Sequence, residues 1–181
     1  KKGVGELGDA VFEEIVYEGY APGGVAVMVE CLTDNKNRSI SDVRMVFDRN
    51  NGNMAGSGAV ARMFRRQAHF VITGDWADED KLMDLVLDAG ANDLTVEDGV
   101  AEVWADPEFF EGLVKLFEEK GIPTEEAELI RRPDMVTEIT DPAIARQVLR
   151  LVERMEELDD VQLVTANYEI ADSIADQLEE E

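Results

Sequence analysis

The pattern of hydrophobic and polar positions divides the middle of the chain into six alternating elements. Short β-prone runs predict strands over residues 69–73, 93–97, 100–105 and 126–132. Hydrophobic residues at helical spacing predict one helix from Asp78 to about Ala89 and a second after Asp106-Pro107, which is a typical helix start. Asp98-Gly99 favours a two-residue hairpin between the middle strands. Residues 67–134 are therefore predicted to form a β-α-β-β-α-β unit, the split pattern of a ferredoxin-like domain.

The flanking segments predict the two halves of a second unit of the same kind. Before the middle unit we expect strands over 11–17, 24–32 and 59–66 and a helix over 40–50 capped by Ser39 or Ser41. After it we expect a strand over 135–140, a helix from Asp141-Pro142 to about Leu158, and a strand within 159–167. The run over 24–32 is almost continuously apolar, as in a central strand.

The predicted fold class is therefore α+β, with two ferredoxin-like domains, one inserted in the other. Residues 1–66 and 135–181 would form the discontinuous domain, and residues 67–134 the inserted one.

Charge is distributed unevenly along the chain, whose formal net charge is −24. Residues 1–66 contain nine Lys or Arg and nine Asp or Glu, residues 67–134 contain five against nineteen, and residues 135–181 contain three against thirteen. Only the stretch 36–66 is basic, with seven cations against Asp42 and Asp48. So acidic a chain repels a bare phosphate backbone, and any nucleic-acid contact must use this stretch or a part that is not present here.

The residue types exclude several classes of function. One cysteine and one histidine provide no disulfide framework and argue against a zinc site or a Cys-His dyad. Cys31 ends an apolar strand and is expected to be buried, and His69 has no evident catalytic partner in the sequence. The acidic residues over 75–80 do not match a calcium loop, and no carboxylate pair is singled out for acid–base chemistry. We expect no catalysis, cofactor or metal, and no membrane span, because no apolar run is long enough.

Four segments closely resemble the YebC family. They are Tyr17-Glu18-Gly19-Tyr20-Ala21-Pro22-Gly23-Gly24-Val25-Ala26, Leu32-Thr33-Asp34-Asn35-Lys36-Asn37-Arg38, Gly52-Asn53-Met54, and Ser57-Gly58-Ala59-Val60-Ala61-Arg62-Met63-Phe64. The resemblance covers nearly the whole chain and implies two ferredoxin-like domains after an N-terminal helical domain, of which Lys1-Lys2-Gly3 look like the tail. The sequence departs from the family pattern at Ala21, Ala59 and Arg62, where Gly, Ser and an aromatic residue are usual.

The family includes bacterial proteins named as probable transcriptional regulators and a mitochondrial translational activator of cytochrome c oxidase. The resemblance therefore implies a non-enzymatic regulator of gene expression, first as a DNA-binding transcriptional regulator. A translation factor acting on the ribosome or messenger RNA is the alternative, and a small-ligand or protein-interaction module is an alternative of another class. The expected location is the cytoplasm, or the mitochondrial matrix if the source is eukaryotic.

The candidate nucleic-acid-binding residues are the cations of the basic stretch and one amide among them: Lys36, Asn37, Arg38, Arg44, Arg49, Arg62, Arg65 and Arg66. The first three are expected on a polar loop, the next two on the following helix, and the last three beside a strand, all on one surface of the first domain. In the alternative interpretation, Asn35 and Asn37 shape a turn and the arginines pair with Glu13, Glu14 or Asp48. If the surface binds a polyanion, reversing Arg38 and Arg65 to Glu should abolish a salt-dependent interaction.

Overall fold

The computed structural model describes residues 11–179, and its chain divides into two compact units. Unit 1 contains the described residues up to Phe64 together with those from Pro133 onward, and unit 2 is formed by residues 65–132. Lys1-Lys2-Gly3, which resemble the end of a helical domain, lie outside the described residues. Strands and helices occur in both units, so the predicted α+β class is confirmed.

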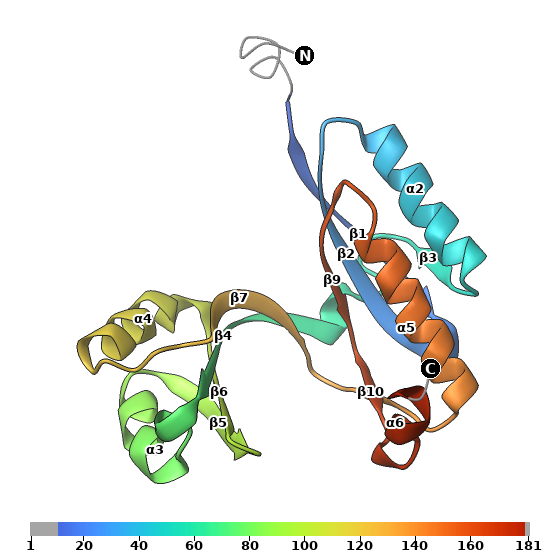
Figure 1. Ribbon diagram of the computed structural model, residues 1–181. Coiled ribbons are helices and arrows are strands. Elements are labelled where there is room, and N and C mark those ends of the chain that lie inside the picture. The colour runs from blue at the N-terminus through green and yellow to red at the C-terminus, as the bar shows by residue number, and fades with distance from the viewer. Residues whose placement is uncertain (1–10, 180–181) are drawn as a thin grey trace. The chain divides into compact units, whose positions relative to one another are not determined.

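Unit 2 is a four-stranded sheet with both of its α-helices on one face (Figure 1). In spatial order its strands are β5 (Ala91–Glu97), β6 (Val100–Ala105), β4 (Phe64–Thr73) and β7 (Glu126–Pro133). Its helices are α3 (Glu79–Asp88) and α4 (Phe110–Glu119). Asp98 and Gly99 both have positive φ angles and form the tight turn between β5 and β6, as predicted.

Alternation along the strands decides which face of unit 2 is buried. Phe70 and Ile72 of β4 and Val103 of β6 point to the helices and pack with Leu82 and Leu113. The residues that alternate with them point to the face without helices and are mainly polar or aromatic. Unit 2 therefore has one hydrophobic core and one sheet face that its own helices do not cover, which we call the free sheet face of unit 2.

Unit 1 is built around a second four-stranded sheet, with two helices on one face (Figure 1). In spatial order the strands are β3 (Asn53–Ala55), β1 (Glu13–Ala21), β2 (Val25–Thr33) and β9 (Val161–Ala166), and all neighbours are antiparallel. The helices are α2 (Lys36–Arg49) and α5 (Pro142–Glu156). The strands β8 (Thr137–Ile139) and β10 (Tyr168–Ile170) form a small parallel sheet, and α6 (Asp172–Glu179) follows them.

One strand of the unit 1 sheet comes from a different part of the chain than the sequence pattern suggested. The predicted β-α-β-β-α-β pattern assigned the segment 135–140 to this sheet, but its strand β8 pairs with β10 in a separate small sheet. The N-terminal strand β1 lies between β2 and β3 instead. The reason is local: β1 and β2 are joined by a three-residue turn at Pro22–Gly24, with Gly23 and Gly24 at positive φ, and pair over nine residues. A short strand more than a hundred residues away cannot compete with this hairpin.

The strand expected over 59–66 is also wrong. Residues 61–63 form a 3₁₀ turn, and β4 begins only at Phe64 and runs on through the segment 69–73. Val60 and Phe64 are buried against Ala26 and Met28 on the face of the unit 1 sheet opposite the helices. The apolar residues that suggested a strand therefore pack on the sheet instead of extending it. As a result β2 is buried on both faces, as its continuous apolar run predicted.

Two helix starts differ from the prediction. Helix α2 begins at Lys36 because the Asn35 side chain accepts the backbone N–H of Arg38, so neither Ser39 nor Ser41 is the cap. Helix α4 begins at Phe110, after a 3₁₀ turn over 107–109, and Asp106 makes no capping hydrogen bond. The predicted caps Asp78 and Asp141 do accept backbone N–H groups of α3 and α5.

Candidate nucleic-acid interface

The start of α2 is held to the segment before β9 by a compact polar cluster. The guanidinium of Arg38 contacts Asp160 at 2.9 and 3.1 Å and Asp34 at 2.7 Å. The buried hydroxyls of Ser39 and Thr33 also donate to Asp160, at 2.9 and 3.3 Å. Arg38, together with these hydroxyls, holds the pKa of Asp160 below its usual range. The cluster therefore fixes the start of α2 against the segment before β9 and gives Thr33, Asp34 and Arg38 of the resembling segment a structural role.

This arrangement changes the expected role of three candidate residues. Lys36, Asn37 and Arg38 lie in the first turn of α2 and not on a loop. Lys36 forms an exposed ion pair with Glu13 at 3.1 Å. Arg38 pairs with Asp34 and Asp160, which are not the carboxylates that the alternative interpretation named for the arginines. Arg38 is already committed to carboxylates within its own unit.

A buried carboxylate organises the loop that leads to Arg62. Glu18 of β1 is only 4% exposed, and it accepts the backbone N–H groups of Gly58, Val60 and Ala61 at 2.6, 2.9 and 2.8 Å. No neighbouring strand accepts these three N–H groups, so the Glu18 carboxylate takes the place of the hydrogen bonds that a paired strand would provide. The loop is consequently a fixed part of unit 1, and the 3₁₀ turn Ala61–Met63 presents Arg62 to solvent.

Two glycines allow α2 and its following turn to approach the sheet. A Cβ atom at Gly19 would lie 2.6 Å from both the Asn53 carbonyl oxygen and the Phe47 ring. A Cβ atom at Gly52 would lie 2.6 Å from the Tyr20 carbonyl oxygen. Glycine at both positions therefore sets the short distance between α2, β1 and β3.

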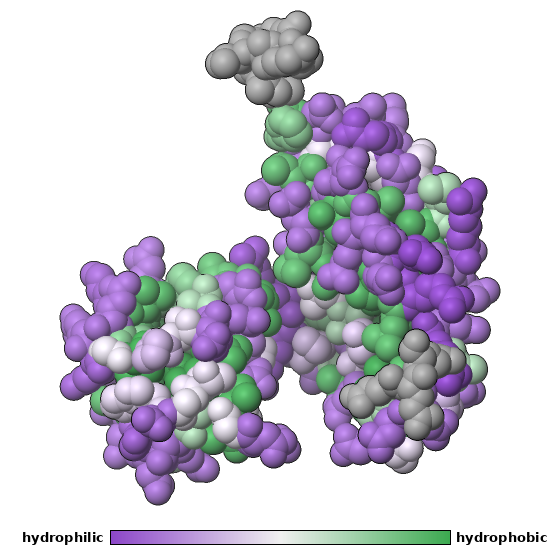
Figure 2. All heavy atoms as spheres, in the orientation of Figure 1, coloured by the Kyte–Doolittle hydropathy of each residue, from purple (hydrophilic) through white to green (hydrophobic). Residues whose placement is uncertain are grey.

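The remaining cations of α2 lie on an exposed, grooved surface. Arg44 and Arg49 are exposed and form no ion pair with any described residue. Although five residues apart, both border one shallow hollow of about 370 Å³, which Asp48 also lines. Arg44 further borders a groove of about 500 Å³ along β1, with Ile40, Met54 and Ser57 among its walls. The surface over α2 is mostly hydrophilic (Figure 2).

The structure does not gather all the predicted cations into one unit. Arg62 belongs to unit 1 with the cations of α2, but Arg65 and Arg66 lie on β4 in unit 2. The expectation that all of them lie on the first domain is therefore wrong for these two residues. The candidate interface in unit 1 consists of Arg44 and Arg49, with Lys36 at the start of the same helix; we call it the arginine face. Arg62 lies apart from it, on the loop that covers the opposite side of the sheet.

Sequence reasoning missed a second cluster, on the free sheet face of unit 2. The imidazole of His69 stacks on Trp104 with ring centroids 4.0 Å apart, and the guanidinium of Arg132 lies 4.1 Å from the Trp104 ring. Arg132 also donates to Asp93 at 3.0 Å and to the buried Gln67 at 3.3 Å. The residues come from four strands, so no local spacing could have revealed them.

Cys31 matches its expected role. Its side chain is buried, and burial, with a further contribution from Asp160, raises the pKa of its thiol to about 11. The thiol is therefore protonated at neutral pH and a poor nucleophile. Within the described part of the chain, no helix has the length and apolar character needed to cross a membrane.

The fold defines a class of protein: a two-unit α+β protein with one ferredoxin-like unit inserted in another. A family model described as the TACO1/YebC second and third domain matches residues 12–168. The chain belongs to this family, and the resemblance found in its sequence is confirmed.

Relatives of known sequence support the assignment. A "Probable transcriptional regulatory protein" of Elusimicrobium minutum is 40% identical over 177 residues, which cover 98% of this chain and 71% of the relative. A protein of the same name from Syntrophomonas wolfei is 45% identical over 176 residues, covering 96% of this chain and 70% of the relative. The crystal structure of a conserved hypothetical protein from Aquifex aeolicus superposes with a TM-score of 0.82 at 40% identity, covering 97% of this chain and 72% of that chain.

Proposed function

We propose that this chain is a non-enzymatic regulator of gene expression that acts by binding nucleic acid through the arginine face of unit 1. Its relatives are named as probable transcriptional regulatory proteins, which supports a DNA-binding regulator as the first form of the proposal. Those relatives are bacterial, and we accordingly propose a cytoplasmic location.

The proposal depends on one observation. Arg44 and Arg49 are exposed, unpaired with any described carboxylate, and placed on a rigid helix whose start is clamped by Asp160. Phosphate contacts need cations that are not neutralised locally, and preorganised side chains lose less entropy on binding. Arg62, on the loop fixed by Glu18, is a separate exposed cation and is not needed for this proposal.

The charge of the whole chain favours a second form of the proposal, in which the target is RNA or the ribosome. At a net charge of −24, the chain repels naked duplex DNA at long range. A ribosomal site contains basic proteins as well as RNA, so it can accept acidic surfaces beside a small basic one. The two forms predict different partners for the same arginine face.

The test compares reversal of the arginine face with an equal change of charge elsewhere. The variant Arg44→Glu/Arg49→Glu and the control Lys115→Glu/Lys120→Glu, on and just after α4 of unit 2, each make the net charge more negative by four. Arg38 is left unchanged, because its reversal would disrupt the Asp160 cluster. Binding of the 181-residue chain to duplex DNA, single-stranded RNA and purified ribosomes is measured at 50 and 200 mM salt.

We expect the arginine variant to lose roughly tenfold or more in affinity for the true partner and to show a shallower salt dependence. The control should retain most of its affinity. Equal losses in both variants would mean that only net charge matters, and unchanged binding in the arginine variant would refute the face. If the unmodified chain binds only DNA, the transcriptional form of the proposal is supported. If it binds RNA or ribosomes, the translational form is supported.

A further inference from the structure

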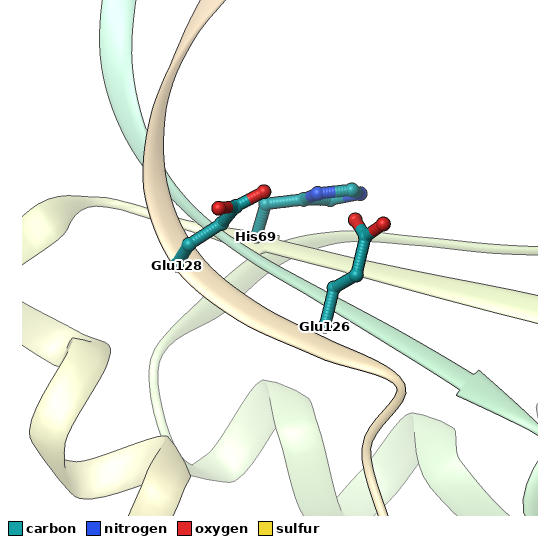
Figure 3. Close-up of side chains that lie close together, drawn as sticks. All are labelled: His69, Glu126 and Glu128. Carbon is teal, nitrogen blue, oxygen red and sulfur yellow. The ribbon is translucent and has the colours of Figure 1, made fainter. Parts of the chain in front are cut away.

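The free face of the unit 2 sheet brings one imidazole and two carboxylates together (Figure 3). A ring nitrogen of His69 on β4 and a carboxylate oxygen from each of Glu126 and Glu128 on β7 all lie within 4.8 Å of one another. β7 is the direct neighbour of β4, and positions 126 and 128 share one face of their strand. The three side chains therefore converge because of strand pairing.

The state of His69 points to a ligand. Its side chain is 9% exposed, and its Nε2 atom lies 2.7 Å from a carboxylate oxygen of Glu102. Its Nδ1 atom is buried and has no hydrogen-bond partner. A carboxylate that accepts the Nε2 proton leaves a lone pair on Nδ1, and metal-binding histidines are commonly held in this way by an outer carboxylate. The imidazole is thus fixed in place with one nitrogen available.

The charges around the cluster also require explanation. Glu126 and Glu128 form no ion pair with any described residue, and Glu102 is engaged with His69. The nearby guanidinium of Arg132 is used by Asp93 and by the Trp104 ring. The two glutamates therefore face the imidazole without a neutralising side chain.

We propose that His69, Glu126 and Glu128 form a binding site for a divalent transition-metal ion such as Zn²⁺ or Mn²⁺, with Glu102 as the outer carboxylate that orients the imidazole. An imidazole nitrogen combined with carboxylates suits these ions better than Mg²⁺ or Ca²⁺, which take oxygen ligands alone. Ligands around such an ion lie about 3 to 4 Å apart at bond lengths of about 2.1 Å, so small rotations of the exposed glutamates close the site. The proposal is independent of nucleic-acid binding.

The first test is calorimetric titration of the 181-residue chain with ZnCl₂, MnCl₂ and MgCl₂. We expect one equivalent of Zn²⁺ or Mn²⁺ to bind more tightly than Mg²⁺. Glu126→Gln/Glu128→Gln should weaken that binding roughly tenfold or more, and His69→Gln should do the same. The control Glu118→Gln/Glu119→Gln on α4 removes the same charge from the same unit and should leave the affinity unchanged. Equal weakening in both double variants would overturn the site and leave only a diffuse attraction of cations.

The second test locates the ion through Trp104, whose ring is stacked on His69. Paramagnetic Co²⁺ bound at the proposed site should quench the fluorescence of Trp104, and Trp104→Phe should remove the quenching while Trp76 still fluoresces. The exposed glutamate pair keeps the test valid even if His69→Gln misfolds. Quenching that persists in Glu126→Gln/Glu128→Gln, or that is absent in the unmodified chain, would overturn the proposal.

Discussion

Units 1 and 2 each have a four-stranded sheet with two helices on one face, but they use the opposite face of the sheet differently. In unit 1 that face is covered by Val60 and Phe64 on a loop anchored by Glu18. In unit 2 the same face is left with His69, Trp104 and Arg132, which pack on one another. The comparison teaches that a ferredoxin-like sheet specifies one buried face only. The second face is available for structure in one unit and for polar chemistry in the other.

The net charge does not separate the two units. Residues 1–64 with 133–181 contain ten Lys or Arg against 23 Asp or Glu, and residues 65–132 contain seven against eighteen. What differs is the proposed binding surface, because Arg44 and Arg49 lie on α2 of unit 1 and the His69 cluster lies on the sheet of unit 2. Three sets of substitutions test how the two units are stabilised, in order of decreasing expected effect.

The largest effect is expected from Glu18→Gln, which removes the negative charge that holds the backbone of the loop 58–61 in unit 1. Three backbone N–H groups lose a charged acceptor in a site that is 4% exposed, and the expected loss of unfolding free energy is about 3 kcal/mol. Urea unfolding followed by circular dichroism measures the loss. Hydrogen exchange should become faster at residues 58–61 and stay unchanged in unit 2.

Glu14→Gln is the matched control for this change, because Glu14 is exposed on the same face of β1. It should alter the unfolding free energy by less than about 0.5 kcal/mol. A similar loss in both variants would show that Glu18 does not hold the loop.

A smaller effect of opposite sign in the two units is expected from replacing glycine by alanine. Gly19→Ala forces a Cβ atom against the Asn53 carbonyl and Phe47, and should cost about 2 kcal/mol or more. Gly112→Ala, on α4 with no atom within 4 Å of the new Cβ, should stabilise its helix by up to about 1 kcal/mol. Thermal unfolding compares the two, and a destabilised Gly112→Ala would contradict the described packing of unit 2.

The smallest effect concerns Asp160 and depends on pH. Because the pKa of Asp160 is lowered in the folded state, its contribution is complete above the unfolded pKa of about 3.9 and disappears as the pH falls through the folded value. At pH 7, Asp160→Asn removes the ion pair with Arg38 and weakens the hydrogen bonds from Ser39 and Thr33. The weakened hydrogen bonds from the two hydroxyls alone should cost about 1 kcal/mol. The difference from the unmodified chain should shrink below about pH 4.

Chemical denaturation between pH 2 and 7 checks this prediction. Asp159→Asn, at the exposed neighbouring position, serves as the control and should show no such pH dependence. A constant difference between Asp160→Asn and the unmodified chain down to pH 2 would mean that the ionised form of Asp160 does not matter.

Local sequence determined most of the elements and the family. Helical spacing with the capping residues Asp78 and Asp141 located α3 and α5, and Asp98-Gly99 located the hairpin of unit 2. The continuous apolar run of β2 indicated its central position. These features depend on residues that are neighbours in the chain, so their physical causes are visible in the sequence.

Tertiary structure alone decided the partners of strands and charges. The sequence could not show that β1 would lie between β2 and β3 in the sheet, that the apolar segment 59–64 would cover β2 instead of forming a strand, or that Arg38 would be held by Asp160. It placed His69 without a partner, although Glu102, Glu126 and Glu128 surround it from two other strands. Such contacts join distant residues, and their free energy depends on burial and geometry that exist only once the sheets have formed.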